Sequence, residues 1–285
     1  MPTLLLLNDH VEKIEMKRIL TIAGSDCGGG AGIQADLKAI TLLGGYGMSV
    51  LTAVTAQNTV GVQGIHEIPA RFVEKQIDSV LSDIGADAIK TGMLVNQEII
   101  EVVSKKIRQY KVKKVVVDPV MVSKSGRSLL RKGAQDALVR KLIPLAWVIT
   151  PNLAEASALT GLKINSVKEM KEAARVIHKL GAKHVVVKGG HLKGTPVDLL
   201  YDGRNFCELK GLRIKSKNTH GTGCTFASAI ATLLARGERV DEAVRKAKTF
   251  IAMAIESGLN LGKGAGPVNA SIYCLLQTLT KKEIT

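Results

Sequence analysis

From Arg18 onward the chain alternates short runs of β-branched residues with longer amphipathic stretches, and glycine, proline or asparagine bounds each run. This alternation favours parallel strands joined by helices, because parallel neighbours need a crossover of a dozen or more residues. The expected strands are 19–23, 49–57, 88–91, 114–118, 147–150 and 184–188. Several of them are apolar at consecutive positions, as strands covered on both faces are. We therefore predict an α/β fold with a doubly wound, mostly parallel central sheet flanked by helices on both faces.

The amphipathic stretches predict the helices that cover this sheet. They span 33–43, 71–83, 97–110, 133–142, 153–160, 167–180, 224–236 and 241–257, with one more near the C-terminus. The runs 197–201 and 206–214 flank Asp202-Gly203, a hairpin turn signal, and predict an antiparallel pair at the edge of the sheet. Residues 1–16 match no element and are predicted to be a tail, whereas 17–285 is predicted to form a single domain.

The composition excludes several classes of protein. With 46% hydrophobic and 23% charged residues, the chain is predicted to be globular, not disordered or fibrous. It contains no apolar run long enough for a membrane helix, so no membrane role is expected. The four cysteines form no CxxC pair, and no HExxH occurs, so we expect neither zinc nor disulfides, and a cytoplasmic location. The net charge of +15 could indicate nucleic acid, but the chain holds few aromatic residues and scatters its basic ones, so no nucleic-acid partner is predicted.

A first glycine cluster, residues 24–32, lies between the first predicted strand and the first predicted helix. Its GxGxxA pattern resembles a dinucleotide fingerprint, but no acid occurs between Asp36 and Glu67 to bind a ribose. A Walker A loop is also excluded, since Gly262-Lys263 is followed by Gly264. We predict that the cluster lets backbone approach a ligand closely, the alternative being a mobile surface turn.

A second glycine motif, THGTGCT at 219–225, runs directly into an alanine-rich helical stretch. Glycines before a helix leave first-turn N–H groups uncovered, and the helix dipole adds positive potential there. Gly221, Thr222 and Gly223 are therefore predicted to form an anion hole for a phosphoryl group. Cys224 lies in the same turn, where its thiolate should be favoured, and is a candidate proton acceptor or nucleophile. The alternative is that Cys224 is a small buried hydrophobe.

Charged residues follow three of the predicted central strands. Asp118 ends a run of valines and falls where ligands bind in open α/β sheets, so it is a candidate to organise Mg²⁺ around phosphates. Glu155 follows the next strand and has two interpretations, a metal contact and a capping box with Asn152. Lys188 ends another strand beside glycines, where its charge could meet a transferring phosphoryl group, the alternative being an ordinary turn.

These motifs together resemble the hydroxymethylpyrimidine/phosphomethylpyrimidine kinases of thiamine biosynthesis, within the ribokinase-like superfamily. The resemblance extends in order over residues 17–275. It rests on 22–26 (IAGSD), 28–38 (GGGAGIQADLK), 55–59 (TAQNT), 90–94 (KTGML), 118–121 (DPVM), 150–155 (TPNLAE), 187–191 (VKGGH) and 219–224 (THGTGC).

The resemblance implies ATP-dependent phosphorylation of 4-amino-5-hydroxymethyl-2-methylpyrimidine and then of its monophosphate, with Mg²⁺. By resemblance, Cys224 is the base and Lys188 shares the neutralisation of charge, while Asp118 and Glu155 hold the metal through waters. Gln57 is expected to read the pyrimidine, because an amide side chain matches an aminopyrimidine edge. The resemblance implies that the remaining pocket residues are Gly24, Asp36, Met93 and Val120. It also implies that Thr219 lies near the phosphates, that 262–269 lies near the adenine, and that the chain could form a homodimer.

Two alternatives stay open at this point. Sugar kinases of the superfamily carry Asp where this chain has Cys224, whereas the cysteine is typical of pyrimidine kinases and of some pyridoxal kinases. A pyridoxal/pyridoxine kinase of the same fold is therefore the nearest alternative, and Gln57 argues against it. A ligand sensor or nucleic-acid-binding protein that kept the fold without activity is the other, and the set of Cys224, Asp118 and Lys188 points instead to chemistry.

Overall fold

The computed structural model describes residues 15–122, 126, 129–131, 133–190, 192 and 194–273. Within these residues the strands form one nine-stranded sheet in the order β3-β2-β1-β4-β5-β6-β7-β8-β9. The strands are β1 (Arg18–Asp26), β2 (Tyr46–Gln57), β3 (Val62–Glu67), β4 (Ala88–Thr91), β5 (Val115–Val117), β6 (Val148–Ile149), β7 (His184–Val187), β8 (Val197–Tyr201) and β9 (Phe206–Lys210). All six predicted parallel strands and the predicted β8–β9 hairpin are therefore present.

The middle of the sheet is parallel and both of its edges are antiparallel. Strands β2, β1, β4, β5, β6 and β7 pair in parallel. Strand β8 runs antiparallel to β7, and β9 antiparallel to β8, as the Asp202-Gly203 turn predicts. The other edge strand, β3, pairs antiparallel with β2 and was not predicted. The predicted α/β class with a mostly parallel, doubly wound sheet is confirmed.

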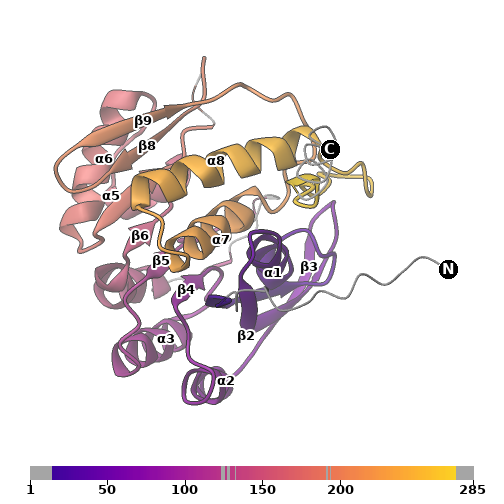
Figure 1. Cartoon of the computed structure of the whole chain (residues 1–285), viewed down its shortest axis with the longest axis vertical. Coiled ribbons are helices and arrows are strands. Elements are labelled where there is room, and N and C mark those ends of the chain that lie inside the picture. Colours follow the sequence, from indigo (N-terminus) through magenta and orange to yellow (C-terminus); the bar gives the residue numbers. More distant parts are fainter. Residues whose placement is uncertain are drawn as a thin grey trace, which may run out of the picture.

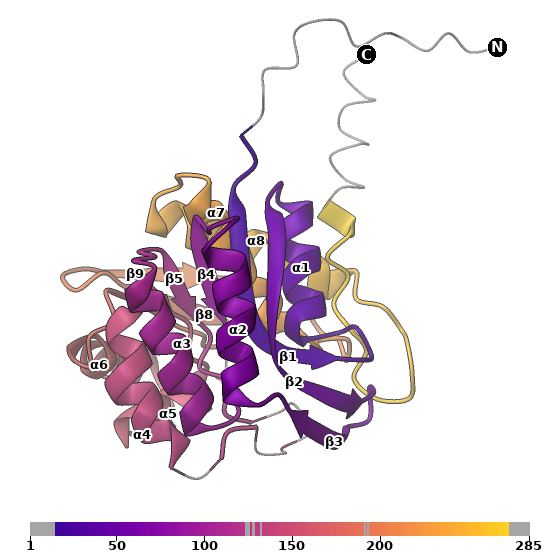
Figure 2. The same ribbon diagram turned by 90° about the horizontal axis from the view of Figure 1, so that it is seen from below.

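Helices cover both faces of this sheet (Figures 1 and 2). They are α1 (Gly32–Leu42), α2 (Ala70–Leu81), α3 (Gln97–Gln109), α4 (Ala134–Ala137), α5 (Leu153–Thr160), α6 (Val167–Lys179), α7 (Thr222–Ala235) and α8 (Val240–Glu256). The five helices from α2 through α6 pack in one apolar core against one face of the sheet. Helices α1, α7 and α8 pack in a second apolar core against the opposite face. Helix α7 is buried over most of its length, because its alanines let it lie close against β1, β4 and β5.

Two predicted elements differ from the structure. The expected helix 133–142 is α4 followed by a π-helical turn at Leu138–Leu142 and a 3₁₀ turn at Ile143–Leu145, where Pro144 cannot donate a backbone hydrogen bond. Strand β9 ends at Lys210, four residues before the expected end. The predicted tail and the predicted C-terminal helix lie mainly outside the described residues.

The parallel strands end at one edge, and this edge gathers the predicted site residues. Thr91 pairs with Val117, and Val117 pairs with Ile149, so the residues that follow β4, β5 and β6 come out side by side. Asp118 follows β5, and Lys188 follows β7 one strand beyond β6. Across the part of the chain that the structure describes, no helix has the length and apolarity needed to span a bilayer.

Candidate active site

The two glycine motifs meet at the carboxyl edge of the sheet. Gly221 is the N-cap of α7 and has φ +82°, a backbone conformation that favours glycine. A Cβ atom on Gly221 would lie 1.8 Å from the carbonyl oxygen of Gly30, so only glycine allows the two loops to approach this closely. The first cluster was predicted to approach a ligand, and here its close contact is with the second motif.

The start of α7 leaves backbone N–H groups free. Thr222 N–H points back to Thr219 O at 3.4 Å, and Thr225 N–H donates to Gly221 O at 2.9 Å. The N–H groups of Gly221, Gly223 and Cys224 have no hydrogen-bond acceptor among the residues that the structure describes. Free N–H groups at the positive end of a helix can hold an anion, which is the arrangement predicted for this motif.

Asp118 and Lys188 lie directly beside these N–H groups. Lys188 Nζ is 3.0 Å from Asp118 Oδ1, and the Asp118 carboxylate is almost fully buried. A Cβ atom on Gly223 would be 3.4 Å from both Asp118 Oδ2 and Lys188 Nζ. Burial opposes the charge of Lys188, but Asp118 and Glu155 outweigh it and raise the pKa of the lysine. A cation and a carboxylate thus adjoin the predicted anion hole.

Glu155 forms the capping box that the sequence predicts, and its contact with a metal stays a prediction. Its carboxylate accepts from Asn152 N–H at 2.8 Å, and Asn152 Oδ1 accepts from Glu155 N–H at 2.9 Å, which is the predicted capping box. Burial raises the pKa of Glu155 to about 7; Lys188 opposes this rise and Asp118 adds to it. Two adjacent carboxylates, one of them hard to ionise, form a donor set that suits a hard divalent cation.

A divalent cation here would need further ligands in addition to protein side chains. Among the described residues, no group of three His, Cys, Asp or Glu side chains is arranged to hold a metal ion. Asp118 and Glu155 alone therefore fit Mg²⁺, which characteristically keeps several waters and is bound through one or two carboxylates and substrate phosphates.

Cys224 lies in the first turn of α7 and is partly exposed. Burial of its sulfur raises the pKa of the thiol to about 11; Lys90 and the Gly32 N–H favour the thiolate, while Asp36 and Asp118 disfavour it. The expectation that the thiolate is favoured is therefore wrong, because desolvation outweighs the helix terminus. The position of Cys224 beside the free N–H groups is as predicted.

Asp36 is fully enclosed by other residues of the chain. The residue is 0% exposed, and its oxygens accept from Thr21 Oγ1 at 2.6 Å, Ser228 Oγ at 2.8 Å and Lys90 Nζ at 2.8 Å. Lys90 is itself 0% exposed. All three of these partners are internal side chains, and the place in the pyrimidine pocket that the resemblance implies for Asp36 stays a prediction. A lysine inside the apolar strand 88–91 was the signal that sequence reasoning overlooked.

The other predicted pocket residues surround the same edge. A Cβ atom on Gly24 would lie 2.3 Å from Met93 Cε, so this glycine makes room for the buried Met93. Val120 is partly buried and lines a small hollow with Gly92 and Asp118. Gln57, at the end of β2, has its terminal amide 3.2 Å from Thr55 Oγ1. The structure thus brings Gly24 against Met93, and Val120 into one hollow with Asp118, without testing their roles.

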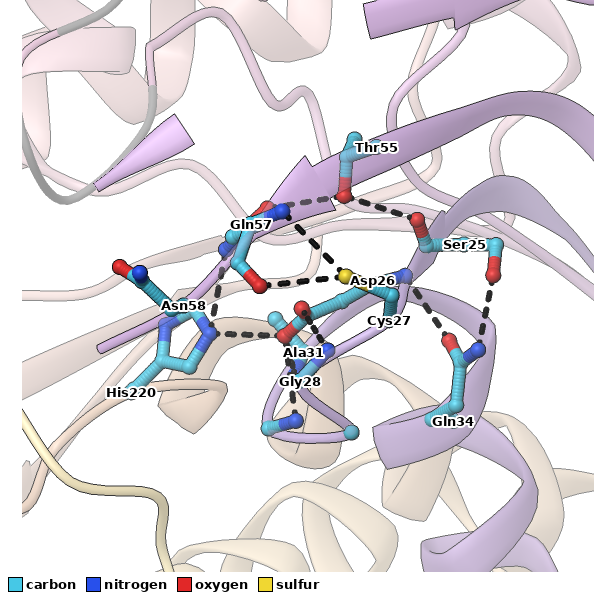
Figure 3. A network of polar contacts seen from close by, with 12 residues as sticks. Ser25, Asp26, Cys27, Gly28, Ala31, Gln34, Thr55, Gln57, Asn58 and His220 are labelled. Carbon is cyan, nitrogen blue, oxygen red and sulfur yellow. Dashed lines mark hydrogen bonds and ion pairs between the residues drawn. The ribbon is translucent and has the colours of Figure 1, made fainter. Parts of the chain in front are cut away.

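Asp26 and His220 form a link that the sequence did not reveal (Figure 3). Their side chains are 2.9 Å apart, although 194 positions separate them in the chain. His220 Nε2 is also 3.2 Å from the terminal amide of Gln57. Burial opposes ionisation of Asp26, but hydrogen bonds from His220, Gly28 and Ala31 keep the pKa of this carboxyl below its usual range. Both residues lie inside motifs quoted above, yet neither motif indicates the pairing.

The segment 262–269 packs against Thr59 and against His220 of the second glycine motif. Gly264 N–H donates to Thr59 Oγ1 at 3.1 Å, and Ala265 N–H donates to Thr59 O at 3.0 Å. His220 N–H donates to Gly266 O at 3.0 Å. The segment predicted to lie near an adenine is therefore fixed beside the N-terminus of α7.

Solved structures define the class to which this fold and site belong. Pyridoxal kinase from Staphylococcus aureus in complex with AMP-PCP and pyridoxal is 42% identical, with a TM-score of 0.84 over 90% of this chain and 95% of that chain. Phosphomethylpyrimidine kinase from Clostridium difficile is 46% identical, with a TM-score of 0.76 over 84% of this chain and 99% of that chain. The class is therefore that of ribokinase-like small-molecule kinases.

The family follows from the sequence comparisons. The phosphomethylpyrimidine kinase family model matches residues 26–269, and the chain belongs to this family. It is 48% identical to the hydroxymethylpyrimidine/phosphomethylpyrimidine kinase of Bacillus subtilis over 88% of this chain and 94% of that protein. It is 56% identical to the thiamine biosynthesis bifunctional protein ThiED of Geobacter sulfurreducens, but spans only 51% of that protein's length. The resemblance inferred from the motifs is confirmed, and the chain is a phosphotransferase.

Proposed function

We propose that this chain transfers the γ-phosphoryl group of ATP to the hydroxymethyl group of 4-amino-5-hydroxymethyl-2-methylpyrimidine, and then phosphorylates the monophosphate to the diphosphate. One observation carries the proposal: free N–H groups at the start of α7 adjoin the Asp118–Lys188 pair, with Cys224 in the same turn. Phosphoryl transfer needs positioning and charge neutralisation more than covalent chemistry, and this arrangement can supply both.

The N–H groups of Gly221, Gly223 and Cys224 would hold the phosphoryl group in transfer, with Thr219 and Thr222 shaping the turn. Lys188 would neutralise charge that develops on the phosphoryl oxygens. Cys224 would accept the hydroxymethyl proton. Since the pKa of this thiol is about 11, only its minor thiolate form can do so, and turnover should rise with pH.

Asp118 and Glu155 would hold Mg²⁺ through waters. The ion would supply positive charge for the phosphate oxygens of ATP. Before Mg²⁺ binds, the Glu155 carboxyl is partly protonated near neutral pH, since its pKa is about 7. Lys188 lies 3.0 Å from Asp118 and also interacts electrostatically with Glu155, so it balances part of the charge of both carboxylates.

Gln57 would read the amino-pyrimidine edge, while Gly24, Met93 and Val120 would enclose the ring. Asp36 would support this pocket from below, through Lys90, instead of touching the ring. The adenine would lie near 262–269, which is tied to Thr59 and His220.

A pyridoxal kinase activity is the second candidate. Its support is the 42–43% identity to pyridoxal kinases, together with a cysteine at 224. Curated relatives that are 48% and 49% identical and matched over most of their length are named hydroxymethylpyrimidine/phosphomethylpyrimidine kinases, which favours the pyrimidine alcohol as the main substrate. A cytoplasmic location and a homodimeric state stay predictions.

A coupled assay that follows ADP release tests the proposal. The purified chain is supplied with ATP, Mg²⁺ and either the pyrimidine alcohol, its monophosphate or pyridoxal. We expect turnover of the first two compounds, with a kcat/KM for the alcohol well above that for pyridoxal. Turnover of pyridoxal alone would overturn the proposed substrate, and no ADP release with any alcohol would overturn the proposed reaction.

A further inference from the structure

The Asp26 carboxylate organises the first glycine loop and reaches the second. Its Oδ1 accepts from Gly28 N–H at 2.9 Å, and its Oδ2 accepts from Gly30 N–H at 3.1 Å and from Ala31 N–H at 2.8 Å. The same Oδ2 is 2.9 Å from His220 Nε2. One carboxylate therefore joins the loop that follows β1 to the residue that precedes the N-cap of α7 (Figure 3).

The His220 ring is fixed in this place. Its backbone N–H and C=O bond to Gly266 O and to Val268 N–H, at 3.0 and 3.1 Å. A Cβ atom on Gly30 would lie 2.4 Å from His220 Cδ2. The ring therefore has little room to turn away from Asp26.

The proton on His220 can be placed from its neighbours. Asp26 is ionised, since three backbone N–H groups and His220 all favour its charged form. An imidazole nitrogen 2.9 Å from a carboxylate oxygen must donate, because two facing lone pairs repel. Nε2 of His220 therefore carries a hydrogen, whether the ring is neutral or charged.

This proton determines how the Gln57 amide is oriented. The end of the amide that lies 3.2 Å from Nε2 must be an acceptor, so it is the oxygen, and the NH₂ group faces Thr55 Oγ1. Thr55 can accept there, because its own hydroxyl donates to Ser25 O at 2.9 Å. With this orientation, Asp26 Oδ2 and Gln57 Oε1 share the single hydrogen of His220 Nε2, and each contact pairs a donor with an acceptor.

We propose that Asp26 and His220 are positioning residues that set the orientation of the Gln57 amide and so the ring edge it accepts. The inference rests on the proposed function, in which Gln57 reads the substrate ring. With Oε1 held by His220 and the NH₂ group held by Thr55, the amide keeps one lone pair and one N–H for a ligand, in a fixed order. An aminopyrimidine offers a ring nitrogen and an amino group side by side, which match this order.

The test compares two alcohols in the wild-type chain and in variants. The alcohols are 4-amino-5-hydroxymethyl-2-methylpyrimidine and the analogue that lacks the 4-amino group. We expect wild type to prefer the amino compound by about tenfold or more in kcat/KM, as one oriented hydrogen bond implies. In His220→Ala and in the isosteric Asp26→Asn, the preference should fall to about twofold or less.

Lys38→Ala is the matched control. Lys38 Nζ ties the same loop through Gly29 O at 2.7 Å, but Lys38 has no contact with Gln57 among the residues that the structure describes. This variant should keep the wild-type ratio of the two alcohols. If His220→Ala and Asp26→Asn slow both alcohols by the same factor and leave the ratio unchanged, the residues are only structural and the inference is overturned.

A measurement without turnover separates this inference from the proposed function. The ¹⁵N shifts of the His220 ring report which nitrogen carries hydrogen. We expect a protonated Nε2 in wild type and loss of that preference in Asp26→Asn, where an amide N–H can face the ring. A wild-type ring without hydrogen on Nε2 would overturn the inference even if the kinase assay succeeds, whereas a protonated Nε2 with no kinase activity would overturn only the function.

Discussion

Two buried lysine–aspartate pairs interact electrostatically with Cys224, and they differ in how completely each is enclosed. In the first, Lys90 and Asp36 are 2.8 Å apart and both side chains are 0% exposed. In the second, Lys188 and Asp118 are 3.0 Å apart, and the lysine side chain is 18% exposed. A Cβ atom on Gly92 would lie only 2.9 Å from Lys90 Nζ, whereas a Cβ atom on Gly223 would lie 3.4 Å from Lys188 Nζ. The first lysine is therefore more tightly enclosed than the second.

The two pairs contain the same residue types but differ in how many hydrogen bonds their aspartates already accept. An aspartate whose oxygens are all used inside the protein has a structural role, whereas one with free oxygens can bind a ligand. Asp36 also accepts from Thr21 and Ser228, so its oxygens are fully used inside the core. Beyond Lys188, Asp118 has one further side-chain contact among the described residues, Thr150 Oγ1 at 3.3 Å. We infer that the first pair supports α7 from below and that the second is available to a ligand.

Replacing Cys224 by alanine should have the largest kinetic effect, because this residue is the proposed acceptor of the substrate proton. We expect kcat to fall by about 10²- to 10⁴-fold, since oriented proton transfer has this magnitude. The unfolding midpoint should stay close to wild type. Cys207→Ala is the matched control, because Cys207 lies on β9 away from the site and its loss should leave kcat unchanged.

The pH profile sharpens this prediction. A thiol with a pKa of about 11 gains about tenfold in thiolate for each pH unit below that value, so log kcat should rise with a slope near one between pH 7 and 9. Cys224→Asp would supply a base that is already ionised and should flatten this slope. Near-full turnover of Cys224→Ala would show that Cys224 does not take the proton.

Methionine at each lysine should separate the two pairs by their effect on stability. Lys90→Met leaves the Asp36 carboxylate buried without its cation, and we expect a loss of about 3–5 kcal/mol in the free energy of unfolding. Lys188→Met should lose less than half as much, because the second pair borders solvent, but should lower kcat strongly. Urea unfolding followed by circular dichroism gives both values. Equal stability losses would contradict the contrast between the pairs.

Much of the fold and the membership of the site could be predicted from local sequence. The strands 88–91 and 184–188 and the helix 153–160 follow from short-range periodicity, and Asp118 and Lys188 follow from their places at strand ends. Strand β3 was missed because it contains Gly64 and has half-exposed or exposed side chains throughout, as an antiparallel edge strand allows.

What could not be predicted depends on partners far away in the chain. Lys90 is 54 positions from Asp36, and no local pattern shows that the two neutralise each other. The helix terminus at Cys224 favours a thiolate when considered alone, but the burial supplied by other elements raises its pKa instead. The topology of the sheet predicts that the motifs lie close together. The desolvation of Cys224 and the full use of the Asp36 oxygens can be seen only in the packed structure.

Glu155, which interacts electrostatically with the second pair, should make the stability of the fold depend on pH. Its pKa rises from an ordinary value of 4.5 to about 7 on folding, so the folded chain holds the proton more tightly. This contribution to stability is present below pH 4.5, falls as pH rises toward 7 and then levels off, a change of about 3 kcal/mol at most. Glu155→Gln keeps the cap but cannot ionise, so it should gain stability relative to wild type between pH 5 and 8 in metal-free buffer.

The control for Glu155 is another glutamate at a helix N-terminus. Glu169 lies in the first turn of α6, where it accepts from Asn165 N–H at an exposed position. Glu169→Gln, measured in parallel, gives the effect of removing a carboxylate from a helix N-terminus. A flat difference between Glu155→Gln and wild type from pH 5 to 8 would mean that Glu155 titrates normally in the folded chain.

Alanine at Gly223 should give the smallest change in stability and tests whether the space beside the second pair is functional. Its Cβ would stand 3.4 Å from both Asp118 Oδ2 and Lys188 Nζ, which is ordinary contact, and Gly223 has no positive φ. Because alanine is the better helix former, Gly223→Ala should leave stability unchanged or raise it by up to about 1 kcal/mol. The added methyl would nonetheless intrude between the free N–H groups and Lys188, so kcat should fall by about tenfold or more, an energy near 1.4 kcal/mol. Gly64→Ala on β3, whose Cβ would be 3.7 Å from Ala56 Cβ, is the control that should leave kcat unchanged. If Gly223→Ala gains stability and keeps its full kcat, the phosphoryl group does not pass through this space, and the exposure of the second pair serves another purpose.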